Sequence, residues 1–443
     1  MVVTATSRRW RDVCPATGGK LDRERGFMRA NNSVLTVLRS LIASAAFALA
    51  LAPGAFAAEK KPTVSPKVAA ALQAAQKAIP AKQFEEAAKK IAEAEAVKKT
   101  DFDQYQINEF KAYLYGNQGG NIPELIDLYE KSLEFPQWFD AKGLLQRYKQ
   151  LSVVTFNNKM YDKAAKYAKQ WLEQEPNDKT ALDVLSKAYY LNKNYADARQ
   201  VLDTMLGNAE KAGEKPDEMT IKLAQSCASE MGDEASVVKG FEKLVRHYPT
   251  PENWEKLLFN NMRAERNDQA LLNMYRLQAD VGAMTSGEQY AEYGRLALAQ
   301  AMPGEAKRIV EKGFELKVLG VNAKEKVRQQ QLLNDAKKKT TEDLASLPQL
   351  EKDVRASKST TGQVEAGLGL AYFSNDMDDQ AIEWLEAGLK KGGMKEPDNY
   401  RMALGVAYLR KGNKDQARAT FAAVQAGSPL AKAANLWTIR TYN

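Results

Sequence analysis

Two stretches near the end of the sequence carry almost the same pattern, and this limits the folds that the chain can adopt. Residues 367–381 read GLGLAYFSNDMDDQA and residues 403–417 read ALGVAYLRKGNKDQA, so seven residues recur 36 positions apart. A period of 20 to 50 residues is typical of arrays of small helical or strand units. One unit of this size cannot bury its apolar face alone, so we expect successive units to stack on one another.

The same internal spacing occurs earlier in the chain and predicts pairs of helices. A Leu precedes an Ala by 13 positions in four places, at Leu151 and Ala164, Leu185 and Ala198, Leu368 and Ala381, and Leu404 and Ala417. Together with Tyr189, Trp171, Pro176, Gly294, Gly369 and Gly405, this pattern resembles the tetratricopeptide repeat. The resemblance implies an all-α fold, a right-handed superhelical solenoid of antiparallel helix hairpins with one concave and one convex face. Gly inside a helix costs roughly 1 kcal/mol relative to Ala, so we expect the three glycines to mark close contacts between helices.

The pattern divides the chain into four regions. Residues 58–320 are expected to form about seven hairpins, and residues 359–443 two more units with a capping helix that includes Trp437. Residues 321–358 lack the repeat pattern and are highly charged. We expect there an irregular helical hairpin, split at Lys339-Thr340 with Thr341 as an N-cap and disrupted at Pro348. This hairpin is either kept within the stack or protrudes as a docking element.

The fourth region, residues 1–57, reads as a leader and signal peptide. We expect Met28 to be the true start. After it, two arginines precede the apolar run Ser40–Ala52, and Ala55-Phe56-Ala57 follows as a cleavage site. The run has 13 residues, too few for the roughly 20 that span a bilayer. No Cys follows the run, so a lipid anchor is not expected. We therefore expect cleavage after Ala57 and a soluble periplasmic protein.

Charge and residue counts argue against nucleic-acid binding and catalysis. The whole chain has a net charge of +8, but residues 1–57 hold eight of the 64 Lys/Arg and three of the 56 Asp/Glu. The remaining 56 basic and 53 acidic residues give +3, too little for a continuous basic surface. A single histidine, His247, and a single cysteine beyond the leader, Cys227, argue against a zinc site and against a nucleophile-base pair. We expect a buried structural thiol at Cys227, no catalytic, cofactor or metal residues, and no enzyme.

What remains is protein recognition. In tetratricopeptide arrays the first helix of each hairpin lines the concave groove, and the resemblance places Lys187, Tyr190, Phe259, Met262, Arg263, Arg295, Phe373 and Arg410 there. The two copies differ at this face, where Phe373 stands against Leu409 and Ser374 against Arg410. We therefore expect a periplasmic scaffold or adaptor whose groove binds an envelope protein or peptide, without cofactor, nucleic acid or membrane span. Binding of peptidoglycan or another glycan, a role in cell-envelope assembly, and self-association are the alternatives.

Overall fold

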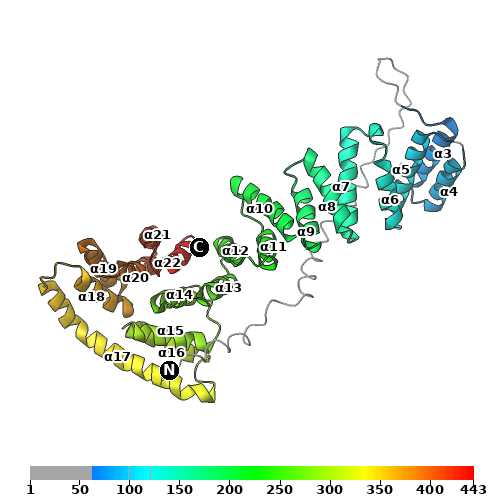
Figure 1. Ribbon diagram of the computed structural model, residues 1–443. Coiled ribbons are helices and arrows are strands. Elements are labelled where there is room, and N and C mark those ends of the chain that lie inside the picture. The colour runs from blue at the N-terminus through cyan, green and yellow to red at the C-terminus, as the bar shows by residue number, and fades with distance from the viewer. Residues whose placement is uncertain (1–61, 98, 120) are drawn as a thin grey trace. The chain divides into compact units, whose positions relative to one another are not determined.

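The architecture is entirely helical over the residues that the structure describes. A computed structural model describes residues 62–97, 99–119 and 121–443, and all its regular elements there are helices (Figure 1). The predicted leader, start and cleavage site lie outside these residues. Among the described helices, none combines the length and the apolar composition needed to cross a membrane.

The chain divides into two compact units, residues 1–208 and residues 209–443. The described part of unit 1 contains α3 (Pro66–Ala78), α4 (Phe84–Glu95), α5 (Asp101–Gln118), α6 (Ile122–Ser132), the 3-10 turn η1 (Pro136–Trp138), α7 (Ala141–Asn157), α8 (Tyr161–Gln174) and α9 (Lys179–Leu191). Helix α10 (Tyr195–Lys211) runs from unit 1 into the first residues of unit 2. Consecutive helices pack against each other, as in α3 with α4, α5 with α6 and α7 with α8.

Local sequence signals begin many of these helices. At α5 the Asp103 amide donates to the Thr100 hydroxyl at 3.2 Å, and the Thr100 amide donates to the Asp103 carboxylate at 2.9 Å. This reciprocal cap satisfies two backbone donors that the first turn leaves unpaired. Asp178 caps α9 in a similar way by accepting from the amides of Thr180 and Ala181.

Unit 2 contains α11 (Glu218–Glu230), α12 (Glu234–His247), α13 (Pro251–Met262), α14 (Asp268–Asp280), α15 (Gly287–Ala299), α16 (Pro303–Glu315), α17 (Ala323–Ala356), α18 (Gln363–Ser374), α19 (Asp378–Lys391), α20 (Pro397–Arg410), α21 (Lys414–Ala422) and α22 (Ala431–Arg440). The glycines of the repeat lie where paired helices meet. A Cβ on Gly369 would lie 2.7 Å from Leu385 Cγ, and one on Gly405 would overlap the ring of Phe421. A larger residue would overpack these contacts, which confirms the reason expected for the helical glycines.

The prediction of a hairpin over residues 321–358 was wrong. One helix, α17, runs from Ala323 to Ala356, and Thr341 is no N-cap, since its hydroxyl donates to the Lys337 carbonyl within the helix. The physical reason is a buried stripe at seven-residue intervals, Leu333, Thr340, Leu347 and Val354, on a helix that packs against α15, α16 and α18. Pro348 removes one helix hydrogen bond, but it lies on the exposed side, where water can satisfy the released carbonyl.

Unit 2 closes on itself through its last helix. Helix α22 packs against α12 and α14, which lie far earlier in the chain (Figure 1). The Trp437 indole donates to the Asn273 carbonyl at 3.0 Å, and Arg440 pairs with Asp280 at 2.7 Å. The buried apolar residues of α13 to α22 accordingly belong to one hydrophobic core. The predicted capping helix exists, and its cap is a contact with α14 within the same unit.

Candidate functional site

The residues predicted to line a groove lie on the first helices of their pairs, in both units. Lys187 and Tyr190 lie on α9 in unit 1. The others belong to unit 2 and lie on or at the ends of α13 (Phe259, Met262, Arg263), α15 (Arg295), α18 (Phe373) and α20 (Arg410). We consider each unit by itself.

In unit 1 the two predicted residues are partly exposed and already have neighbours. The Lys187 ammonium pairs with Asp183 one turn earlier on α9 at 2.7 Å. The Tyr190 ring meets Tyr195 edge to face, with ring centroids 5.5 Å apart. Both side chains remain partly accessible from solvent.

In unit 2 three of the predicted residues on or at the ends of α13 and α15 are exposed, namely Phe259, Arg263 and Arg295, and we call these three residues the first-helix surface. Phe259 is 41% exposed. Arg263 pairs with Glu234 at 2.6 Å and Arg295 with Glu292 at 2.6 Å, yet about half of each arginine side chain is exposed. Met262 lies partly buried against the hydrophobic core.

The prediction for Phe373 was wrong, because this side chain is fully buried. The Arg276 guanidinium lies 5.2 Å from its ring centroid and that of Arg410 lies 4.6 Å from it. Arg276 comes from α14, so the closure of unit 2 brings an earlier helix over the end of α18. Phe373 therefore packs against its own chain and does not face a groove.

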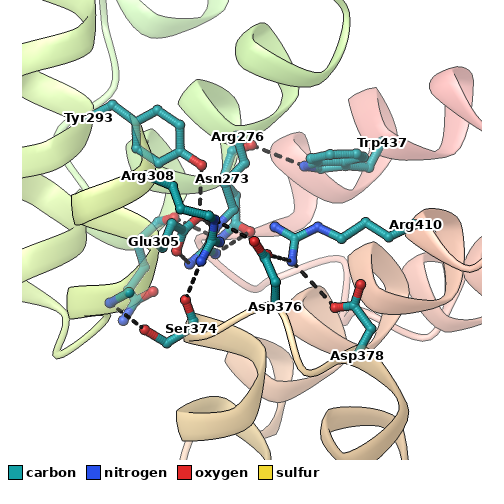
Figure 2. A network of polar contacts seen from close by, with 12 residues as sticks. Asn273, Arg276, Tyr293, Glu305, Arg308, Ser374, Asp376, Asp378, Arg410 and Trp437 are labelled. Carbon is teal, nitrogen blue, oxygen red and sulfur yellow. Dashed lines mark hydrogen bonds and ion pairs between the residues drawn. The ribbon is translucent and has the colours of Figure 1, made fainter. Parts of the chain in front are cut away.

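A buried ion pair stands at the centre of this closure. The Arg276 guanidinium donates twice to the Glu305 carboxylate, at 2.6 and 2.7 Å, and once to the Asn273 amide oxygen at 3.0 Å. The Tyr293 hydroxyl donates to Glu305 at 2.7 Å (Figure 2). Burial alone would raise the pKa of Glu305, but the charge and hydrogen bonds of Arg276, with the bond from Tyr293, outweigh it and lower this pKa to about 2.

A second, partly exposed set of contacts joins α16 to the later helices. Arg308 donates to the Ser374 carbonyl at 2.6 Å and pairs with Asp376 at 2.6 Å. Asp376 also pairs with Arg410 at 3.1 Å, and Arg410 reaches Asp378 at 3.4 Å (Figure 2). Burial lowers the pKa of Arg308 and raises that of Asp378.

This polar network balances its charges and joins helices. Three arginines face three carboxylates in it: Arg276, Arg308 and Arg410 with Glu305, Asp376 and Asp378. A guanidinium that is held this way is not a general acid or base, and the Glu305 carboxylate stays ionised near neutral pH. Within the described residues, no group of three His, Cys, Asp or Glu side chains is arranged to hold a metal ion.

The cysteine and the histidine that were considered as possible zinc ligands or as a nucleophile-base pair lie on different helices. Cys227 on α11 is fully buried, which confirms the expectation of a buried thiol. His247 ends α12, where burial and the neighbouring Arg246 and Lys243 lower its pKa.

Sequence reasoning missed a group of aromatic side chains in unit 1, which we call the aromatic cluster: Phe102, Tyr105, Phe135, Trp138 and Phe139. Phe135 and Trp138 stack with centroids 4.5 Å apart and planes 14° apart, and Tyr105 lies 5.1 Å from Trp138 and 5.7 Å from Phe139. Tyr105 is buried and the other four rings are half-buried. The signal was present in the sequence, since FPQWF places three aromatic residues in a connection between helices, where polar residues are usual.

One helix pair of this chain matches a known repeat family in sequence. A tetratricopeptide repeat family model matches residues 401–429, which include most of α20 and all of α21. No curated protein sequence matches the chain significantly.

Several solved structures resemble the chain. A tetratricopeptide repeat protein from Parabacteroides merdae is 15% identical, with 61% of this chain and 99% of that chain covered and a TM-score of 0.30. The TPR domain of P58(IPK) is 16% identical, with 84% and 98% covered and a TM-score of 0.22. The APC/C hetero-tetramer Cut9-Hcn1 is 11% identical, with 85% and 84% covered and a TM-score of 0.22.

The geometry of the matched repeat agrees with the family model. In residues 401–429, Gly405 on α20 gives room to the ring of Phe421 on α21, and Ala417 is fully buried in the same pair. These are the small residues at the helix contact that the repeat pattern requires. Residues 401–429 thus match the tetratricopeptide repeat family in sequence, and the α20–α21 pair has the close helix contact that this repeat pattern requires.

Proposed function

We propose that this protein is a non-enzymatic scaffold or adaptor of the periplasm that binds an envelope protein or peptide through the first-helix surface of α13 and α15. The tetratricopeptide fold supports protein recognition in general, since its stacked helices offer an extended surface. The observation that carries the proposal is Phe259, which exposes 41% of its surface one turn from the half-exposed Arg263. Aromatic and arginine side chains are enriched among the residues that dominate binding energy at protein interfaces.

The proposed location depends on the leader pattern in residues 28–57, which lies outside the described residues. The test is to isolate the protein from a periplasmic fraction and to sequence its N-terminus. We expect the first residue to be Ala58. An N-terminus at or before Met28 in a cytoplasmic fraction contradicts the proposed location and leaves the proposed binding surface to be tested separately.

Partner binding is tested by crosslinked capture from a periplasmic extract, followed by affinity measurement with the captured protein. We expect Phe259→Ala to weaken the affinity about 30-fold, the effect of a side chain that contributes about 2 kcal/mol. The matched control is Val327→Ala on α17, because Val327 is also apolar and 79% exposed. Equal affinity of the Phe259 variant and the wild type contradicts the proposed surface, and loss in the control instead assigns binding to α17.

A point substitution is used to test α17, because this helix packs against three other helices and deleting it would disturb unit 2. The alternatives are tested with the same variant. Sedimentation of the wild type with purified cell wall, lost in the Phe259 variant, indicates glycan binding. A solution mass of two or more chains that becomes one chain in the variant indicates self-association.

A further inference from the structure

The connection between α6 and α7 places an unusual number of rings at the surface of unit 1. Within residues 133–140 only Pro136–Trp138 form a regular element, the short turn η1. Phe135, Trp138 and Phe139 nevertheless meet Phe102 and Tyr105 of α5 in the aromatic cluster. Because four of the five rings are only half-buried, the cluster offers apolar area to solvent as well as packing α5 against the connection.

Beside the cluster lies a buried ion pair with incomplete hydrogen bonding. The Arg147 side chain is 6% exposed. Its guanidinium lies 4.0 Å from the ring centroid of Tyr129 and 5.8 Å from that of Phe139. Its Nη2 donates to Glu109 Oε2 at 2.5 Å. Arg147 Nε and Nη1 and Glu109 Oε1 are buried and have no hydrogen-bond partner. Such groups are rare in folded proteins, and each one calls for an explanation.

The pattern of these unpaired atoms defines the chemistry of a ligand that would complete them. Nε carries one N–H and Nη1 carries two, while Glu109 Oε1 is a single acceptor atom. A complementary ligand therefore needs more acceptors than donors. Arg147 and Glu109 neutralise each other, so the site does not select a charged ligand. The neighbouring rings require that the ligand also present flat apolar groups.

A proline-rich peptide meets all three requirements. In the polyproline II conformation its carbonyls make no internal hydrogen bonds, and each proline lacks the N–H donor. Its pyrrolidine rings pack on aromatic side chains, as in other domains that bind such segments in aromatic-lined grooves. We propose that the aromatic cluster and Arg147 form a binding site for a proline-rich segment of another protein. Phe135 and Trp138 contact the pyrrolidine rings, and Arg147 donates to a peptide carbonyl when Phe139 turns aside.

This site is distinct from the first-helix surface and does not depend on it, since the two lie in different units. Either one can bind while the other does not. The two proposals therefore fail separately, and Phe259→Ala serves here as a matched aromatic control.

The test is to titrate a labelled, end-capped oligoproline peptide with the protein and to follow its fluorescence anisotropy. A capped Gly-Ser peptide of equal length is the control peptide. We expect saturable binding of the oligoproline alone. Trp138→Ala should weaken it by about tenfold or more, and Arg147→Lys by about tenfold, because lysine keeps the charge opposite Glu109 but loses the guanidinium donors. Phe259→Ala should bind as the wild type does.

Circular dichroism and thermal melting establish that each variant is folded, and Trp138→Ala, at a half-buried position, keeps the test valid if Arg147→Lys unfolds. Three results overturn the proposal. These are no saturable oligoproline binding at millimolar protein, equal binding by the wild type and the Trp138 variant, or binding of a soluble chitooligosaccharide in place of the peptide. The last result assigns the cluster to a glycan.

Discussion

The closure of unit 2 can be tested most directly at Trp437. Its side chain is 2% exposed, its indole stacks on Phe421 with centroids 5.8 Å apart, and it donates to the Asn273 carbonyl of α14. Replacing a buried aromatic side chain by Ala costs about 3–5 kcal/mol. In Trp437→Phe a ring remains but the hydrogen bond to the Asn273 carbonyl is lost. This loss should cost about 0.5–1.5 kcal/mol, because the carbonyl still accepts its helix hydrogen bond within α14.

Hydrogen exchange locates where this energy is lost. In an open array each repeat contacts only its neighbours, so the loss of Trp437 would be felt in α20 and α21 alone. In the closed unit we expect the amides of α12 and α14 to exchange faster as well in Trp437→Ala, and less so in Trp437→Phe. The melting temperature of unit 2 should fall by about 10 °C in Trp437→Ala, since each kcal/mol lowers it by about 2–4 °C for a unit of this size.

The matched control is Trp171→Ala in unit 1, which removes another almost fully buried indole. It should lower protection around α8 and leave the exchange of α14 as in the wild type. Unchanged exchange of α12 and α14 in Trp437→Ala would contradict the closure, because the contact between residues 164 positions apart would then not contribute to stability.

Three further changes test the packing of unit 2. Gly304→Ala should destabilise the unit by about 1–3 kcal/mol in chemical denaturation, because the new Cβ would lie 2.5 Å from the Ser374 carbonyl oxygen. Its control, Gly367→Ala on α18, has no atom within 4 Å of the new Cβ and should stabilise by about 1 kcal/mol. The pKa of the Glu305 carboxyl is lowered to about 2, so its ionisation stabilises the folded state above pH 4.5 by about 3 kcal/mol. This stabilisation is lost as the pH falls toward 2. This pH dependence should be absent from denaturation curves of Glu305→Gln. Pro348→Ala should raise the free energy of unfolding by about 1–3 kcal/mol by restoring a hydrogen bond in α17, and an unchanged or lower stability would contradict a continuous helix there.

The helix pairs were predictable because their signal is local. Leu, Ala and Gly at fixed spacings decide which side chains can meet inside one pair, and those contacts span few positions. Gly405 against Phe421 is such a contact. The residues at this spacing are buried, as Leu151, Ala164 and Leu404 show.

Helix α17 was not predictable from the same signals. Its buried stripe includes Thr340, and the run Lys337-Lys338-Lys339 with Pro348 suggests a break in an isolated helix. The helix continues because neighbouring helices bury Leu333, Leu347 and Val354, and packing outweighs a local preference of this kind. The aromatic cluster was missed for a similar reason, since its rings come from α5 and from a connection about 30 positions later.

The closure of unit 2 changes the interpretation of the two similar stretches, residues 367–381 and 403–417. The positions at which the copies differ were expected to select a partner, and they are Phe373 against Leu409 and Ser374 against Arg410. In the structure Phe373 packs under Arg276, the Ser374 hydroxyl accepts from the Gly304 amide at 3.1 Å, and Arg410 pairs with Asp376.

These unrepeated residues therefore recognise another part of the same unit. A repeat that stacks only on its neighbours can use the same residues in each copy, but a contact between α18 and α16 occurs once and needs residues that occur once. The residues that differ between copies record such contacts as readily as they record a partner. A search for partner-binding residues in this protein should therefore begin with unrepeated side chains that remain exposed, as Phe259 does and Phe373 does not.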